Sequence, residues 1–68
     1  MKYTLYVDGT EVTTHDKIKS LKKEAEFWFE NLNAFDAKIV KGNVTYLKQY
    51  DDKKWWRMEQ IKQNNLNN

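Results

Sequence analysis

The chain has no cysteine, no proline and only two glycines among its 68 residues. Without cysteine, disulfide bonds and thiolate zinc sites are excluded. The single histidine, His15, cannot build a transition-metal site alone, so we expect no metal and no cofactor. Because Gly9 and Gly42 both fall in expected turns, no glycine-rich loop remains to cradle a phosphate group.

Long apolar runs are also missing. No segment approaches the roughly 18 apolar residues of a membrane-spanning helix. The N-terminal stretch MKYTLYVDG does not provide the apolar core of a signal peptide. We therefore expect a soluble, cytoplasmic protein that makes no contact with a membrane.

An excess of one charge sign is absent too. The formal net charge at pH 7 is only +2, and all but one of the twelve basic residues are lysines. Bidentate recognition of guanine favours arginine, and Arg57 is the only arginine in the chain. Sequence-specific DNA recognition is therefore disfavoured.

Catalytic groups are equally scarce. His15 and Asp16 are neighbours in the sequence, and this spacing does not let the carboxylate orient the ring as a catalytic pair requires. No Ser-His-Asp set or evident carboxylate dyad accompanies them. We expect neither an enzyme nor a binding site for a small-molecule substrate.

What the chain has in abundance is aromatic side chains: three Trp, four Tyr and three Phe. A domain of this size buries only about 60% of the surface that its unfolded chain exposes, so its stability is expected to be marginal. Large rings offer the greatest burial gain for each residue, and they are expected to stabilise the fold in place of disulfides.

The N-terminal third predicts a β-hairpin. Residues 3–7 alternate large and polar side chains, Asp8-Gly9 is a strong type I′ turn signal, and residues 11–14 return. The two-residue loop predicts a register that pairs Val7 with Thr10 and Leu5 with Val12.

A helix is predicted next, with Thr14 or Asp16 as its N-cap and an end near residue 33. Its apolar side chains share an arc about 100° wide, as in an amphipathic surface helix. They are Ile18, Leu21, Ala25, Trp28, Phe29 and Leu32. Phe27 lies nearly opposite that arc, so it is either an anchor for a partner or covered by Leu66 of the tail.

The remaining chain predicts three more strands, at residues 37–40, 44–50 and 55–61. For 55–61 a helix capped by Asp51 or Asp52 stays open as an alternative. Residues 1–62 are therefore expected to form a single α+β domain. Its order is β-β-α-β-β-β, with an antiparallel sheet of four to five strands and one long amphipathic helix on one face. Residues 63–68 form a polar tail that we expect to be disordered.

The adjacent tryptophans Trp55 and Trp56 raise a packing problem. Neighbouring side chains on a strand point to opposite faces, and a single helix covers only one face. With residues 51–54 as the loop, the predicted pairs are Tyr50 with Trp55, Lys48 with Arg57 and Leu47 with Met58. One indole then joins the core, and the other lies on an exposed surface that carries both aromatic and basic residues. If residues 55–61 are instead helical, both rings are half buried.

These observations favour a small non-enzymatic interaction protein that docks on a protein or on a protein–nucleic-acid complex. The candidate contact residues are Phe27, Lys48, Tyr50, Lys53, Lys54, Trp55, Trp56, Arg57 and Met58. Compact, Lys- and Asn-rich chains of this style are common among phage and mobile-element inhibitors, including anti-CRISPR proteins. The likeness is one of size and composition, with no shared motif.

Three other interpretations stay open. Exposed Trp and Tyr rings stack on the bases of single-stranded nucleic acids, with lysines following the backbone. Alternatively, the exposed face is buried against a second copy in a structural homodimer. In the third interpretation, the tryptophan pair serves only the fold, because aromatic residues are good strand formers.

Overall fold

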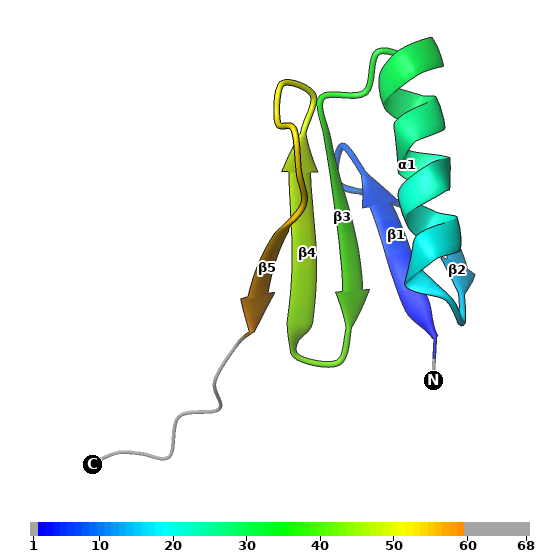
Figure 1. Ribbon diagram of the computed structural model, residues 1–68. Coiled ribbons are helices and arrows are strands. Elements are labelled where there is room, and N and C mark those ends of the chain that lie inside the picture. The colour runs from blue at the N-terminus through cyan, green and yellow to red at the C-terminus, as the bar shows by residue number, and fades with distance from the viewer. Residues whose placement is uncertain (1, 60–68) are drawn as a thin grey trace.

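The computed structural model describes residues 2–59, which form a five-stranded antiparallel sheet with one helix on one side (Figure 1). The elements are β1 (Tyr3–Val7), β2 (Thr10–His15), α1 (Ile18–Asn31), β3 (Asp36–Lys41), β4 (Val44–Gln49) and β5 (Trp56–Glu59). Across the sheet the strands follow the order β2-β1-β3-β4-β5. This is the α+β class that the sequence predicts. The expectations for Ile61, Leu66 and the polar tail lie outside the described residues.

The hairpin of β1 and β2 turns at Asp8 and Gly9, whose φ angles of 51° and 86° fit a type I′ turn. Val7 lies opposite Thr10 as predicted, but the predicted pairing of Leu5 with Val12 is wrong. Leu5 lies opposite Thr13 instead, because a β-bulge shifts the register between Leu5 and Tyr6. The strong turn signal therefore fixes the register only up to the bulge.

Asp8 also connects the turn to the start of β3. Its Oδ1 accepts hydrogen bonds from the backbone N–H groups of Phe35 and Asp36, both at 2.9 Å. The backbone N–H of Asp8 donates to the carbonyl of Asp36 at 3.1 Å. One carboxylate thus holds together segments that lie 27 and 28 residues apart in the sequence.

The helix begins later than the sequence predicts. Neither Thr14 nor Asp16 is its N-cap, because β2 continues to His15 and the N-cap residue is Lys17, which makes no side-chain capping bond. The ring Nδ1 of His15 accepts a hydrogen bond from the backbone N–H of Lys17 at 3.0 Å instead. This bond satisfies one of the donors left free at the helix start. The helix ends at Asn31, two residues before the predicted end at 33.

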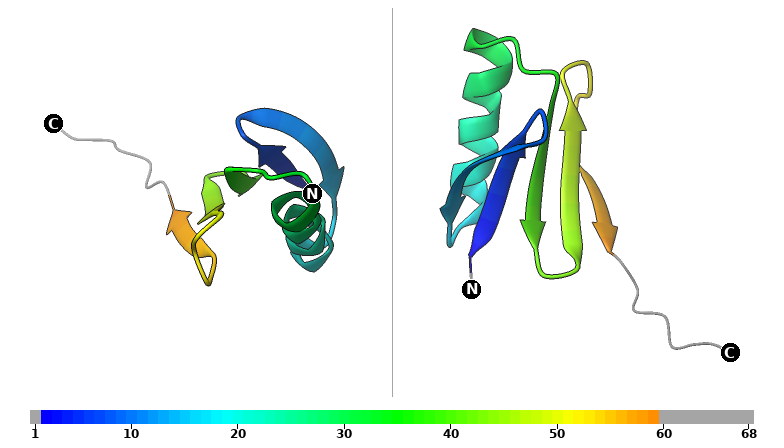
Figure 2. Two further views of the ribbon diagram at one scale, coloured as in Figure 1. Left: turned by 90° about the horizontal axis from the view of Figure 1, so that it is seen from above. Right: turned by 180° about the vertical axis from the view of Figure 1, so that it is seen from behind.

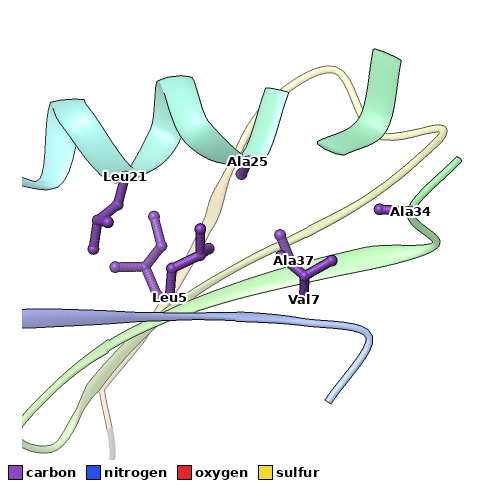
Figure 3. Close-up of a cluster of buried hydrophobic side chains, with 7 residues drawn as sticks. Leu5, Val7, Leu21, Ala25, Ala34 and Ala37 are labelled. Carbon is purple, nitrogen blue, oxygen red and sulfur yellow. The ribbon is translucent and has the colours of Figure 1, made fainter. Parts of the chain in front are cut away.

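The core lies between α1 and the half of the sheet formed by β1, β2 and β3 (Figures 1 and 3). Leu21 and Ala25 point down from the helix toward Leu5, Val7 and Ala37 on the sheet (Figure 3). Ala34 and Ile39 complete this buried cluster. Half-buried side chains pack around it, and they are Tyr3, Val12, Ile18, Trp28, Phe29, Tyr46 and Trp55.

Strands β4 and β5 extend beyond the helix, as the end-on view shows (Figure 2). Residues 56–59 are a strand, so the helical alternative is wrong there. The predicted register is also wrong, because Leu47 pairs with Trp56 rather than with Met58, a shift of two residues. A shift of two leaves every side chain on its predicted face, since the side-chain period of a strand is two. We call the hairpin formed by β4, β5 and the connection between them the wing.

Candidate binding surface on the open face of the sheet

The sheet face that points away from the helix, which we call the open face, carries two rows of side chains across neighbouring strands. The first row runs from β1 to β5 through Tyr6, Lys38, Leu47 and Trp56. The second row runs through Thr4, Val40, Thr45 and Met58. Cross-strand neighbours lie about 5 Å apart at their Cβ atoms, so each row forms a contact surface. Both rows end on the wing with their largest apolar side chain.

Trp56 and Met58 are the most exposed apolar groups of the open face. Trp56 is 54% exposed and Met58 is 55% exposed, whereas Tyr6, Val40 and Leu47 beside them are partly buried. No element formed by residues 2–59 covers this face (Figure 2). Solvated sheet faces ordinarily carry polar side chains, so a large indole and a thioether in this position are unusual.

Two shallow hollows share Leu47 and Met58 in their linings. One, of about 400 Å³, lies where the pairing of β4 and β5 stops, and its wall includes Trp56 and Asp52. The other, of about 540 Å³, lies toward the β3–β4 turn, with Lys38 and Glu59 at its margin. The two hollows offer a partner recesses to fill beside the exposed side chain of Met58.

Lysine ammonium groups lie over both aromatic rings of the first row. Nζ of Lys54 is 5.0 Å from the ring centroid of Trp56, and Nζ of Lys38 is 5.2 Å from that of Tyr6. Both distances fall within the range of cation–π contacts, which attract an ammonium to the ring face. The acidic residues Asp36 and Glu11 belong to the same face, so it carries charges of both signs around its apolar part.

Trp55 lies on the other side of the sheet, as the alternation of side chains requires. It is half buried and packs against the core cluster. Nζ of Lys22 on the helix lies 6.0 Å from the Trp55 ring and 5.5 Å from the Tyr46 ring. The two adjacent indoles therefore have different environments, with Trp55 against the core and Trp56 facing solvent.

Lys48 is not available to steer a partner. It is only 9% exposed, and its Nζ donates to Oε2 of Glu26 on the helix at 2.7 Å. The same ammonium lies 4.9 Å from the ring centroid of Phe29. We therefore remove Lys48 from the candidate surface, since its charge connects the wing to the helix.

Arg57 and Glu59 project from β5 on the side of the helix, and both side chains are about half exposed. Their closest atoms are Nη1 and Oε1, at 3.4 Å. A hydrogen bond from the guanidinium to the side chain of Tyr46 is the main cause that raises the pKa of Arg57 above its ordinary value. Arg57 is therefore a fixed positive charge on this edge of the sheet.

The other predicted contact residues do not gather on the open face. Phe27 is 53% exposed on the helix, across the sheet from Trp56. Tyr50 follows β4 and is 61% exposed, with its ring centroid 5.3 Å from that of Phe35. Lys53 and Lys54 are exposed in the β4–β5 connection, and of these two only Lys54 lies over the Trp56 ring.

Sequence reasoning left some surface residues out of the candidate set. Tyr6, Val40 and Leu47 belong with Trp56 and Met58, and strand alternation alone was enough to place them there. Phe35, which is 56% exposed, lies in the link before β3, where no periodic pattern applies. Nothing in the local sequence signalled its contact with Tyr50.

Some kinds of site find no support in the part of the chain that the structure describes. Residues 2–59 contain no cluster of three or more His, Asp or Glu side chains able to hold a metal ion. No helix among them has the length and apolar character needed to cross a membrane.

Comparisons with protein-family models, with curated proteins and with solved structures each find no match to this chain.

Proposed function

We propose that this chain is a small, cytoplasmic, non-enzymatic binding protein that docks on a protein partner through the open face of its sheet. The observation that carries the proposal is the exposure of Trp56 and Met58 on a face that the helix leaves bare. Burial of apolar surface contributes roughly 25 cal/mol for each Å² removed from water. A partner that covers these two side chains and Leu47 beside them gains binding energy at no cost to the core.

The composition of the surface favours a protein over a nucleic acid. Interface centres are enriched in Trp, Tyr and Met, and their rims are polar. The open face follows this arrangement, with Trp56 and Met58 surrounded by Lys38, Lys54 and Asp36. A single-stranded nucleic acid needs a continuous track of positive charge, and the acidic Asp36 and Glu11 interrupt such a track here.

The test is capture of a partner on immobilised protein, comparing variants that share exposure but differ in position. Trp56→Ala and Met58→Ala remove the anchors of the open face. Phe27→Ala and Phe35→Ala remove equally exposed rings elsewhere, and they serve as matched controls. We expect the first pair to weaken capture at least about tenfold, as interface anchors do, and the second pair to leave it unchanged.

Two other outcomes contradict the proposal. If Phe27→Ala abolishes capture and Trp56→Ala does not, the partner binds the helix instead of the sheet. If oligo-dT quenches tryptophan fluorescence of the wild type but not of Trp56→Ala, and salt reverses the quenching steeply, the open face binds single-stranded nucleic acid.

Our hypothesis for the partner is a host protein, with this chain acting as a phage or mobile-element inhibitor of it. Lysates of candidate host cells are therefore the first source to test.

A further inference from the structure

The outer edge of β5 has no strand beside it within residues 2–59, and all four of its residues are exposed. Unpaired strand edges present free N–H and C=O groups to another strand, and proteins often blunt them with bulges or polar side chains. The opposite edge of the sheet, β2, has both protections, since it carries a β-bulge and its sequence is TEVTTH. β5 has no bulge, and its two polar side chains, Arg57 and Glu59, carry opposite charges, so they can pair with a second copy of the strand rather than repel it.

We propose that β5 pairs antiparallel with β5 of a second copy of this chain, about a two-fold axis through Met58. The two copies then form one continuous sheet, and reciprocal ion pairs join Arg57 of each copy to Glu59 of the other. This pairing uses the strand edge rather than the open face, so it stands independently of the proposed function.

Strand geometry leaves few registers for such a dimer. In an antiparallel pair, residues directly opposite each other share a face of the sheet. A two-fold axis perpendicular to the sheet must therefore pass through a residue position. An axis between two positions would set Arg57 opposite Met58, and these two side chains lie on opposite faces of the sheet. The possible centres within β5 are its four residues, Trp56, Arg57, Met58 and Glu59.

The charges of Arg57 and Glu59 favour one of these four axis positions. An axis through Arg57 sets two guanidinium groups opposite each other, and an axis through Glu59 does the same to two carboxylates. An axis through Trp56 needs Lys54 and Trp55 in extended pairing, but the strand begins only at Trp56. The axis through Met58 sets each Arg57 opposite a Glu59 and each Met58 opposite its copy. Within one chain the same two charges are only loosely joined, at 3.4 Å.

The dimer is also consistent with the rest of the molecule. A two-fold axis perpendicular to the sheet keeps both helices on one side, and α1 packs over β1, β2 and β3, away from the new interface. On the other side, the Trp56–Met58 ends of the two open faces become neighbours and form one longer apolar stripe. A contact this short lies below the standard interface size, so we expect a dissociation constant of roughly 0.1 mM.

The test is sedimentation velocity from about 10 μM to about 1 mM, a range that brackets the expected dissociation constant. We expect the wild type to pass from monomer to dimer. Arg57→Glu gives two acidic residues on the edge, and Glu59→Arg gives two basic ones, so each variant alone weakens the dimer at least about tenfold. An equimolar mixture of the two variants restores the dimer, because every cross-strand pair again joins opposite charges.

Lys23→Glu and Glu24→Arg are the matched controls, because they make the same charge changes at exposed positions on the helix. We expect each of them to dimerise like the wild type, and their mixture to gain nothing. A wild type that stays monomeric throughout overturns the proposal. So does a dimer that both edge variants keep, or a mixture that fails to restore it while each variant retains the wild-type circular dichroism spectrum.

Discussion

The two halves of the sheet differ in what covers them. The half formed by β1, β2 and β3 lies under the helix and contributes Leu5, Val7, Ala37 and Ile39 to the core. The helix does not pack over the wing, and the only buried residue in β4 and β5 is Lys48. The comparison indicates that one half provides most of the stability and that the other half is available for contacts.

The largest expected effect lies in the covered half. Ile39 is fully buried beneath the helix, so Ile39→Ala removes apolar contacts and leaves a cavity. We expect a loss of roughly 2–5 kcal/mol in the free energy of unfolding, measured by urea denaturation. A domain this small has little stability in reserve, so the variant is expected to be partly unfolded at 37 °C. Met58→Ala on the wing is the contrast, with a loss below about 1 kcal/mol.

The adjacent tryptophans sharpen the comparison within one dipeptide. Trp55→Ala removes a ring that packs against the core, and we expect it to cost about 2 kcal/mol, less than full burial would because the ring is half exposed. Trp56→Ala removes a ring that is 54% exposed, and we expect it to cost less than about 1 kcal/mol. Equal losses in urea denaturation would mean that Trp56 serves the fold as much as Trp55 does.

Substitutions of Asp8 test how much the hydrogen bonds between the β1–β2 turn and the start of β3 stabilise the covered half. Asp8→Ala leaves the backbone N–H groups of Phe35 and Asp36 without their acceptor and puts alanine at a φ of 51°. We expect a loss of about 1–2 kcal/mol in the free energy of unfolding. Asp8→Asn keeps an acceptor oxygen and tolerates positive φ, so it should retain most of the stability. If the two variants are equally stable, the hydrogen bonds that the Asp8 side chain accepts from Phe35 and Asp36 contribute nothing measurable to the free energy of unfolding.

Lys48 marks the boundary between the two halves, and Lys48→Ala is expected to cost less stability than Ile39→Ala, Trp55→Ala or Asp8→Ala. Lys48→Ala removes both the ion pair with Glu26 and the side-chain stem against Phe29, at a cost of about 1 kcal/mol. Glu26 is partly exposed and regains water, which limits the loss. Lys48→Met keeps the length and apolar stem, so its free energy of unfolding should lie close to that of the wild type. A Met variant as unstable as the Ala variant would show that the charge itself matters.

The sequence predicted the features that depend on local chemistry and periodicity. Asp8-Gly9 predicted the turn, and the alternation of side chains placed Trp55 and Trp56 on opposite faces even though the register was wrong by two residues. The bulge in β2 was missed, because the turn signal fixes the register only up to the bulge. The late helix start was missed, because His15 continues the strand and its ring accepts the hydrogen bond from the backbone N–H of Lys17. The burial of Lys48 was beyond local reasoning, since its partner Glu26 lies 22 residues away. Contacts between distant segments decide which charges are free.

Native-state amide hydrogen exchange tests the central claim most directly, because it measures opening free energies residue by residue. The account predicts that amides of β1 and β3 that bond to neighbouring strands exchange only through global unfolding. Amides of β5 that bond to β4 should exchange through local opening, at least about 100-fold faster, at a concentration low enough to keep the chain monomeric. Protection of the β5 amides equal to that of β1 would contradict the account, because the wing would then unfold only together with the core.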